Sequence, residues 1–154
     1  MHIATRSGKI EISSEKITAE IASELSNILK PGDIVFLIGE MGVGKTTLVR
    51  FLINEFQKKN NIDISEVPSP TFNIMNEYQI KSLLIQHYDL YRLKNFDETK
   101  NLGIFEDEIK AIKLIEWPNI LLNDDKDFIK LKLSYSKDYI SREFSYENLI
   151  KNEK

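Results

Sequence analysis

Within the first forty residues, apolar side chains first recur at the spacing of a helix and then form a continuous run. Ser13 and Ser14 are favourable residues at a helix N-terminus, and Pro31 ends the periodicity that follows them. Segment 34–38 is a continuous run of β-branched and other apolar residues, typical of a strand buried on both faces. The helical spacing is carried by Ile17, Ile21, Leu25 and Ile28. This pattern predicts a helix followed by a buried strand.

The rest of the chain alternates apolar segments with polar and proline-containing loops. A second helix is expected after Gly44, and its apolar stripe is Leu48, Leu52 and Phe56. Segment 95–108 is expected to be helical or loop-rich, and Pro118 to begin a short helix. The segments expected to be extended are 7–12, 72–80, 82–89, 112–117, 128–135 and 139–146. Hairpins are expected to join 72–80 to 82–89 and 128–135 to 139–146. The mixture predicts an α/β sandwich, with a frayed tail over 148–154.

Composition indicates one globular domain over residues 1–154. Hydrophobic residues make up 42% and charged residues 29% of the chain, and no apolar run approaches the roughly 18 residues of a membrane span. The N-terminus lacks the long apolar core of a signal peptide. There is no cysteine, which excludes disulfides and thiolate metal sites. We therefore expect a cytoplasmic protein with no membrane association.

The charge balance favours contact with nucleic acid only through other proteins. A chain that binds nucleic acid alone usually has a basic balance or a basic stripe. This chain has 21 basic and 24 acidic side chains, a net charge of −3 and only four arginines. We therefore expect no DNA binding, and no binding of RNA by this chain alone.

The strongest motif lies between the strand predicted at 34–38 and the second helix. Residues 39–46, Gly-Glu-Met-Gly-Val-Gly-Lys-Thr, fit the phosphate-binding pattern G-x-x-x-x-G-K-[ST]. A buried strand before the loop and an amphipathic helix after it are the context that this motif requires. The alternative is a glycine-rich turn that binds nothing, and the context argues against it.

Each residue type in this loop suits the binding of a polyphosphate. Gly39, Gly42 and Gly44 are expected to adopt positive φ, so that backbone N–H groups converge on phosphate oxygens. The positive end of the helix dipole points at the same anion. Lys45 is expected to reach the β- and γ-phosphates, and Thr46 to offer its hydroxyl to Mg²⁺.

A phosphate loop also needs a carboxylate for Mg²⁺ and a group that orders the attacking water. Glu116 ends the apolar segment 112–115 and Asp89 ends the extended segment 82–88, so both are expected at the sheet edge beside the loop. The alternative for each is a solvated carboxylate at a strand end. Thr71 lies in a loop ahead of a strand, as does a switch threonine that senses the γ-phosphate. Its alternative is a turn hydroxyl.

Three other side chains each have two interpretations. His87 is either a proton shuttle or a half-buried strand histidine, and we expect the second. Trp117 either stacks near the nucleotide or packs beside Pro118. Arg92 either contacts phosphate or pairs with Asp89.

Adenine nucleotides are favoured, largely by elimination. A GTPase usually carries an Asn-Lys-x-Asp guanine-binding string and an Asp-x-x-Gly switch, and neither occurs in this chain. A small-molecule kinase usually closes an arginine-rich lid over the phosphates. Four scattered arginines do not supply such a lid.

Five strings occur in a fixed order along the chain: residues 39–47, Ser69-Pro70-Thr71-Phe72, His87-Tyr88-Asp89-Leu90-Tyr91-Arg92-Leu93, Leu102-Gly103-Ile104 and Glu116-Trp117-Pro118. In this order and spacing they resemble the TsaE (YjeE) family of bacterial ATPases, over roughly residues 13–142. The five strings together are highly specific, whereas the phosphate loop alone is not. The resemblance implies a small P-loop NTPase fold of the α/β class, with a central mixed sheet flanked by helices and a C-terminal β-hairpin.

The resemblance also implies a part in tRNA modification. Members of the family bind ATP or ADP with Mg²⁺, hydrolyse ATP slowly by themselves, and associate with the threonylcarbamoyl transferase TsaD and its partner TsaB. The complex forms threonylcarbamoyladenosine at position 37 of tRNAs that read ANN codons. The ATP cycle of the family resets the complex between turnovers and does not perform the transfer.

Matching the motifs residue by residue carries the family's roles onto this chain. The expected catalytic residues are Lys45, Thr71, Asp89 and Glu116, with Thr71 switch-like and Asp89 a metal-shell or water-positioning group. Thr46 and Glu116 are expected to bind Mg²⁺. The residues expected to contact the nucleotide are Glu15, Thr18, Gly39, Met41, Gly42, Val43, Gly44, Lys45, Thr46, Thr47, Trp117, Ser141 and Arg142. Ser141 stands where the family has glycine.

Three functions fit these residues. The first is an ATPase whose hydrolysis drives a tRNA-modifying assembly. The second is an adaptor in which bound ATP, without obligatory hydrolysis, controls assembly. The third is a small-molecule phosphotransferase, which the missing arginine-rich lid disfavours.

Overall fold

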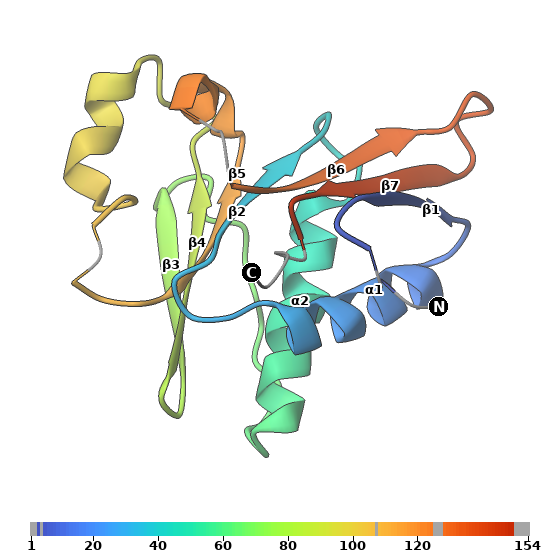
Figure 1. Cartoon of the computed structure of the whole chain (residues 1–154), viewed down its shortest axis with the longest axis horizontal. Coiled ribbons are helices and arrows are strands. Elements are labelled where there is room, and N and C mark those ends of the chain that lie inside the picture. The colour runs from blue at the N-terminus through green and yellow to red at the C-terminus, as the bar shows by residue number, and fades with distance from the viewer. Residues whose placement is uncertain (1–2, 4, 107, 125–127, 150–154) are drawn as a thin grey trace.

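Backbone hydrogen bonds join seven strands into one sheet in the computed structural model of the chain, which describes residues 3, 5–106, 108–124 and 128–149 (Figure 1). The strands are β1 (Gly8–Ile12), β2 (Ile34–Ile38), β3 (Met75–Ile80), β4 (Leu83–Asp89), β5 (Ile112–Glu116), β6 (Ile129–Tyr135) and β7 (Arg142–Glu147). The α-helices are α1 (Glu15–Ile28) and α2 (Lys45–Lys59), and the 3₁₀-helices are η1 (Phe96–Leu102) and η2 (Pro118–Asp124). None of the helices in the described part of the chain has the length and hydropathy required to span a bilayer.

The sheet is mixed, as predicted, with strand order β1-β7-β6-β2-β5-β4-β3. The four neighbours β6, β2, β5 and β4 run parallel, while β3, β7 and β1 each pair antiparallel with their neighbours. Both predicted hairpins are therefore confirmed, β3–β4 through the turn at Lys81 and β6–β7 near the C-terminus. Because β2, β5 and β4 are parallel, their carboxyl ends meet at one edge of the sheet, where ligands of such sheets bind.

Different elements cover the two faces of the sheet. Helices α1 and α2 lie against each other on one face, and Figure 1 shows both on the same side of the strands. Val35 and Leu37 of β2 belong to the core with these helices, whereas Phe36 between them belongs to a second core. Leu121 of η2 and Ile104, just after η1, complete that second core. Alternate residues of each buried strand therefore face opposite layers, as the pleat requires, and the predicted α/β architecture is confirmed.

Side chains contact both ends of η1. At its start, Asn95 Oδ1 accepts a hydrogen bond from the backbone N–H of Glu98 at 3.1 Å, which caps this helix. Lys113 of β5 donates from Nζ to the carbonyl oxygens of Gly103 (3.0 Å) and Ile104 (2.5 Å). These bonds hold the segment that follows η1 against β5. The prediction of a helical or loop-rich segment is confirmed for 95–106 and 108, and residue 107 lies outside the described residues.

Two strands begin later than predicted because tight turns precede them. Residues 71–73 form a turn in which the backbone N–H of Ile74 donates to the Pro70 carbonyl at 2.7 Å, and Ile74 has φ 67°. The extended segment predicted at 72–80 therefore starts at β3. The backbone N–H of Tyr139 likewise donates to the Ser136 carbonyl at 2.9 Å, so β7 starts after this turn. Alternating apolar residues continue through both turns, which is why the pattern placed the strands too early.

The frayed tail predicted over 148–154 is wrong for its first two residues, and 150–154 lie outside the described residues. Asn148 Oδ1 accepts hydrogen bonds from the Arg6 guanidinium at 2.8 and 3.1 Å, and its Nδ2 donates to the Phe128 carbonyl at 3.2 Å. Leu149 is buried, and its backbone N–H donates to the Arg6 carbonyl at 3.1 Å. These contacts fasten the chain beyond β7 to the segment before β1.

Tyr88 on β4 is a buried phenol whose ionisation opposes folding. It is 1% exposed, and its hydroxyl lies 3.2 Å from both Gln86 Oε1 and the Leu102 carbonyl oxygen. Burial raises the pKa of Tyr88 to about 12, and the charges of Glu77 and Glu106 add to this effect. A raised pKa in the folded state means that stability is fully present below the unfolded pKa of 10.0 and is lost as pH rises towards about 12.

We expect Tyr88→Phe to remove this part of the alkaline destabilisation. Between pH 9 and pH 11.5 the wild type should lose roughly 2 kcal/mol more unfolding free energy than Tyr88→Phe, because each pKa unit corresponds to about 1.4 kcal/mol. Urea denaturation at the two pH values measures the difference. Tyr139→Phe, at an exposed tyrosine, is the matched control and should behave as the wild type. Parallel losses in wild type and Tyr88→Phe would contradict the assignment.

Candidate active site

The glycine-containing loop between β2 and α2 ends at the N-terminus of α2. Gly42 has φ 79° and Gly44, the N-cap of α2, has φ 115°, conformations that L side chains rarely adopt. No side chain of the described residues caps this helix start. The first backbone N–H groups of α2 therefore remain available to an anion, which the helix dipole also favours.

Gly39 is required for a different reason from the one predicted. It is absent from the residues with positive φ in the described chain. A Cβ atom at this position would instead lie 2.6 Å from the Leu133 carbonyl oxygen of β6 and 2.8 Å from Val43 Cγ1. The prediction of positive φ is correct for Gly42 and Gly44 and wrong for Gly39, where close packing of the loop against β6 excludes a side chain.

Lys45, at the first position of α2, is buried and faces the sheet edge. Its Nζ donates to the Gly39 carbonyl oxygen at 2.5 Å and lies 3.5 Å from the centroid of the Trp117 ring. Desolvation lowers the pKa of the Lys45 ammonium, and the charges of Glu116 and Asp89 oppose that shift. Trp117 thus contacts the loop lysine, and a contact between Trp117 and a nucleotide stays a prediction.

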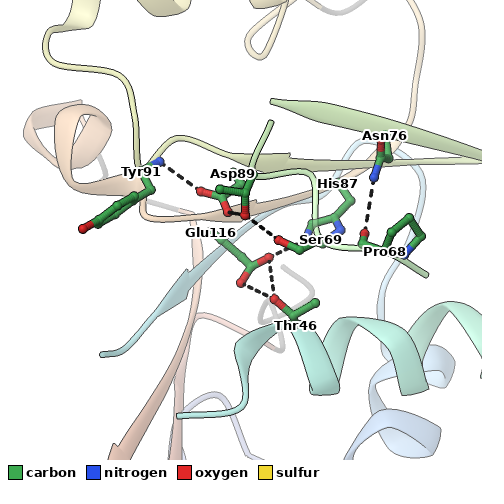
Figure 2. Close-up of polar contacts among 9 residues, drawn as sticks. Thr46, Pro68, Ser69, Asn76, His87, Asp89, Tyr91 and Glu116 are labelled. Carbon is green, nitrogen blue, oxygen red and sulfur yellow. Dashed lines mark hydrogen bonds and ion pairs between the residues drawn. The ribbon is translucent and has the colours of Figure 1, made fainter. Parts of the chain in front are cut away.

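Glu116, at the carboxyl end of β5, forms the centre of the polar contacts (Figure 2). Glu116 is 2% exposed, and its carboxylate accepts one hydrogen bond that Thr46 Oγ1 shares between Oε1 at 3.0 Å and Oε2 at 3.3 Å. Residues 112, 114 and 116 lie on one face of β5, and Ile112 and Leu114 belong to the core under the helices. Glu116 lies on the same face and points at the start of α2, where the phosphate loop, and not the apolar core, packs against the sheet.

Asp89 ends β4 directly beside Glu116, because the parallel register of β4 and β5 pairs these two residues. Its Oδ2 accepts a hydrogen bond from Thr71 Oγ1 at 3.1 Å, and its Oδ1 accepts one from the backbone N–H of Tyr91 at 3.0 Å. The Thr71 hydroxyl also lies 2.7 Å from that of Ser69 (Figure 2 labels Ser69, Asp89 and Tyr91). Thr71, Asp89 and Glu116 are thus placed in one cluster from three separate segments.

These groups line a cavity of about 410 Å³. Ten of the expected site residues line it, namely Met41, Gly42, Gly44, Lys45, Thr46, Thr47, Thr71, Asp89, Glu116 and Trp117. A second cavity of about 150 Å³ is bordered by Glu15, Thr18, Val43 and Arg142, and it shares Gly44 and Thr47 with the first. The position of the second cavity beside the phosphate loop suits the base end of a nucleotide.

Two expected nucleotide-binding residues border neither of these cavities. The Gly39 carbonyl oxygen accepts the Lys45 hydrogen bond, and Gly39 borders a third hollow on the other flank of the loop. Ser141 closes the β6–β7 turn, where its backbone N–H donates to Asp138 Oδ1 at 3.3 Å and its hydroxyl donates to Ser136 Oγ at 3.1 Å. A nucleotide contact at Ser141 remains an expectation.

His87 is a member of the cluster; sequence reasoning named it as a possible proton shuttle but did not place it beside Glu116. It is 0% exposed, so the expectation of a half-buried histidine is wrong. Its Nε2 lies 2.6 Å from Glu116 Oε2. The available signal was the spacing of two residues between His87 and Asp89, which puts both on one face of β4. The contact itself depends on pairing with β5, which the local pattern does not specify.

Arg92 makes no hydrogen bond to Asp89 among the described contacts, and a phosphate contact stays a prediction. Its guanidinium carbon lies 4.3 Å from the centroid of the Phe72 ring, a cation–π contact, and the residue borders the large cavity. Asp89 takes its hydrogen bonds from Thr71 and Tyr91. Arg92 is therefore held at the cavity mouth by an exposed aromatic ring.

The donor atoms in the cavity suit a hard divalent cation. No group of three or more His, Cys, Asp or Glu side chains in the described part of the chain forms a metal site. Thr46 and Glu116 nevertheless present hydroxyl and carboxylate oxygens to one another at 3.0 Å. Mg²⁺ prefers oxygen ligands and usually takes only one or two protein carboxylates beside substrate phosphates and water. The residues present therefore fit this ion.

A protein-family model matches most of the chain. The family model described as "Threonylcarbamoyl adenosine biosynthesis protein TsaE" matches residues 12–144. A Rickettsia conorii protein named tRNA threonylcarbamoyladenosine biosynthesis protein TsaE is 41% identical over 111 residues, which cover 71% of this chain and 61% of the relative. The chain thus spans less than two thirds of that relative. An Aquifex aeolicus protein of the same name is 35% identical over 109 residues, covering 71% and 75%.

Comparison with solved structures supports the fold. The crystal structure of Bacillus subtilus YdiB superposes with a TM-score of 0.68 and 24% sequence identity, covering 95% of this chain and 87% of that one. Together with the loop between β2 and α2, this likeness confirms the predicted α/β fold of the P-loop type.

We expect Gly39→Ala to destabilise the loop more than Gly42→Ala. The added methyl at position 39 must displace the β6 backbone or Val43, and overpacking costs typically about 1–3 kcal/mol. Its 2.6 Å approach to a backbone oxygen places it towards the upper end. At Gly42 the nearest atom to a Cβ is Tyr135 Oη at 3.8 Å, so the destabilisation comes from the positive φ alone, roughly 1–2 kcal/mol. Urea denaturation midpoints measure both losses, and a smaller loss for Gly39→Ala would contradict the packing account.

Proposed function

This chain belongs to the TsaE family, and on that premise we propose that it is a Mg²⁺-dependent P-loop ATPase. It acts in the formation of threonylcarbamoyladenosine at position 37 of tRNAs that read ANN codons. In this proposal the ATP cycle supports turnover of the threonylcarbamoyl transferase, and the chain does not transfer the group itself. The family match over residues 12–144 supports the pathway, and the site geometry supports the chemistry.

The convergence of Lys45, Thr46, Glu116 and Asp89 on one cavity carries the proposal. A cavity of about 410 Å³ next to a glycine loop and an open helix N-terminus suits a polyphosphate. The second cavity beside it, bordered by Glu15, Thr18 and Arg142, suits an adenine. Both ATP and ADP would be held by the same residues, because the loop contacts phosphates that both contain.

The proposed reaction is in-line attack of water on the γ-phosphate, with cleavage of the bond to the β-phosphate oxygen. The Lys45 ammonium and the loop N–H groups stabilise the charge that develops on the transferred group. Asp89 orients the attacking water, and Thr71 senses the γ-phosphate through its hydrogen bond to Asp89. The water oxygen joins the γ-phosphorus, one of its protons ends on the phosphate product, and the other is released to solvent.

Thr46 and Glu116 are the residues that would hold Mg²⁺, through the oxygens that already face each other. The bound ion would neutralise charge on the β- and γ-phosphates. Glu116 is buried and in hydrogen bonds with two side chains, so its carboxylate is oriented before any ligand arrives.

The proposed partners are TsaD and TsaB, with tRNA contacted through them in the cytoplasm. The net charge of −3 supports indirect contact with RNA. The cavity mouth carries exposed apolar side chains, since Met41 is 65%, Tyr91 52% and Phe72 78% exposed. Such side chains suit contact with another protein better than contact with water.

We expect Lys45→Ala to lose ATP turnover by at least roughly 100-fold, because the main positive charge at the phosphates is removed. Lys58→Ala, at an exposed lysine on the same helix, is the matched control and should turn over ATP like the wild type. Phosphate release by the purified chain, alone and with TsaD and TsaB, measures this. Wild-type turnover by Lys45→Ala would refute the site. Turnover that rises on addition of the partners would support the coupled ATPase.

We expect Glu116→Gln to bind ATP yet fail to support threonylcarbamoyladenosine formation by the reconstituted complex. The amide removes the metal-binding charge but keeps the size of the side chain. Mass spectrometry of nucleosides from the tRNA measures the product, and Glu147→Gln, at an exposed strand end, is the control. Full modification with Glu116→Gln, without hydrolysis, would instead favour the ATP-gated adaptor.

A further inference from the structure

His87 is a wholly buried polar side chain with one specific contact. It lies on β4 on the same face as Ile85, which packs in the core under the helices. Its Nε2 is 2.6 Å from Glu116 Oε2 (Figure 2). An ionised carboxylate only accepts hydrogen bonds, so at this distance the proton is assigned to the ring nitrogen and Nε2–H donates to Glu116. Nδ1 is buried and has no hydrogen-bond partner among the described residues.

A residue that only filled this space would not need the ring. Leucine or phenylalanine would pack beside Ile85 without placing an unpartnered polar atom in the interior, and such an atom costs stability. The hydrogen bond of Nε2, and not the volume of the ring, therefore explains a histidine at this position. Its one hydrogen bond goes to the carboxylate at the centre of the site.

The contact restricts how Glu116 can present its two oxygens. Oε2 accepts the hydrogen bond from His87, whereas Oε1 is the oxygen nearer to the Thr46 hydroxyl, at 3.0 Å against 3.3 Å. The last side-chain torsion of a glutamate rotates over a broad range. A hydrogen bond to one carboxylate oxygen, here from His87, restricts the carboxylate to a single orientation. Ligands of metal ions are commonly oriented by such partners, whose loss costs about 10- to 100-fold in metal affinity.

We propose that His87 is a positioning residue that holds the Glu116 carboxylate in the orientation that accepts a divalent cation together with Thr46. This inference rests on the proposed function, because it concerns the ion that accompanies ATP. It assigns a role to the first residue of the string His87-Tyr88-Asp89, of which Asp89 already belongs to the site.

The test compares His87→Leu with His87→Gln. Glutamine can place an amide N–H near the position of Nε2, whereas leucine keeps much of the volume and removes the donor. For each protein the dissociation constant of ATP is measured with Mg²⁺ and with EDTA, by calorimetry or by emission of Trp117, the single tryptophan. The ratio of the two constants reports the coupling between metal and nucleotide, independently of turnover.

We expect His87→Leu to reduce this ratio by roughly 10-fold or more while the metal-free affinity stays unchanged, and His87→Gln to retain it within about 3-fold. An unchanged ratio in His87→Leu would overturn the proposal, and so would equal losses in both variants. A wild type that binds no ATP, or binds it without any effect of Mg²⁺, would instead refute the proposed function.

Should His87→Leu fail to fold, the wild type supplies a second measurement. The chain has two histidines, His2 and His87, so the ring nitrogens are readily separated in a proton–nitrogen NMR spectrum. We expect the Nε2–H signal of His87 to shift when Mg²⁺ is added to the ATP-bound protein, beyond any shift caused by ATP alone. An unchanged chemical shift of this signal, in a protein shown to bind Mg²⁺, would overturn the positioning role.

Discussion

The parallel pairing of β4 with β5 is the constraint on which the site depends. Its register sets Asp89 opposite Glu116, and both residues end their strands at the edge where β2 leads into the phosphate loop. Side chains alternate along a strand, so this register also fixes which residues face α2. A slip of β4 by one residue against β5 would turn Asp89 towards η1 and η2, away from Glu116 and the phosphate loop. The chemistry is therefore set by the geometry of the sheet.

Burying several charged groups at this edge is tolerated because each one has a specific partner. Glu116 receives hydrogen bonds from Thr46 and His87, and Asp89 receives them from Thr71 and the Tyr91 backbone. Lys45 has the Gly39 carbonyl and the Trp117 ring. Strained backbone accumulates at the same place, since Ile74 has φ 67° and Trp117 φ 55°. The surrounding sheet holds these conformations, which leaves the polar groups arranged before a ligand binds.

The sequence-based predictions succeeded for elements whose pattern is local and failed where a turn or a distant contact overrides that pattern. The run 34–38 and the stripe along α2 were predictable because buried strands and amphipathic helices have distinct periods. The late start of β3 was not, because the hydrogen bond from Ile74 to Pro70 closes a turn within apolar residues. Asn148 was assigned to a frayed tail because its partners Arg6 and Phe128 lie far away in sequence.

The phosphate loop, its flanking strand and helix, and the two acidic residues at strand ends could be predicted because a short stretch of consecutive residues specifies each. Which groups meet follows from the tertiary structure: Glu116 contacts both Thr46 and His87, and Gly39 is required by the approach of β6 and not by its own φ. Such contacts join residues far apart in the chain. They depend on strand order and register, which are properties of the whole sheet and which no local periodicity specifies.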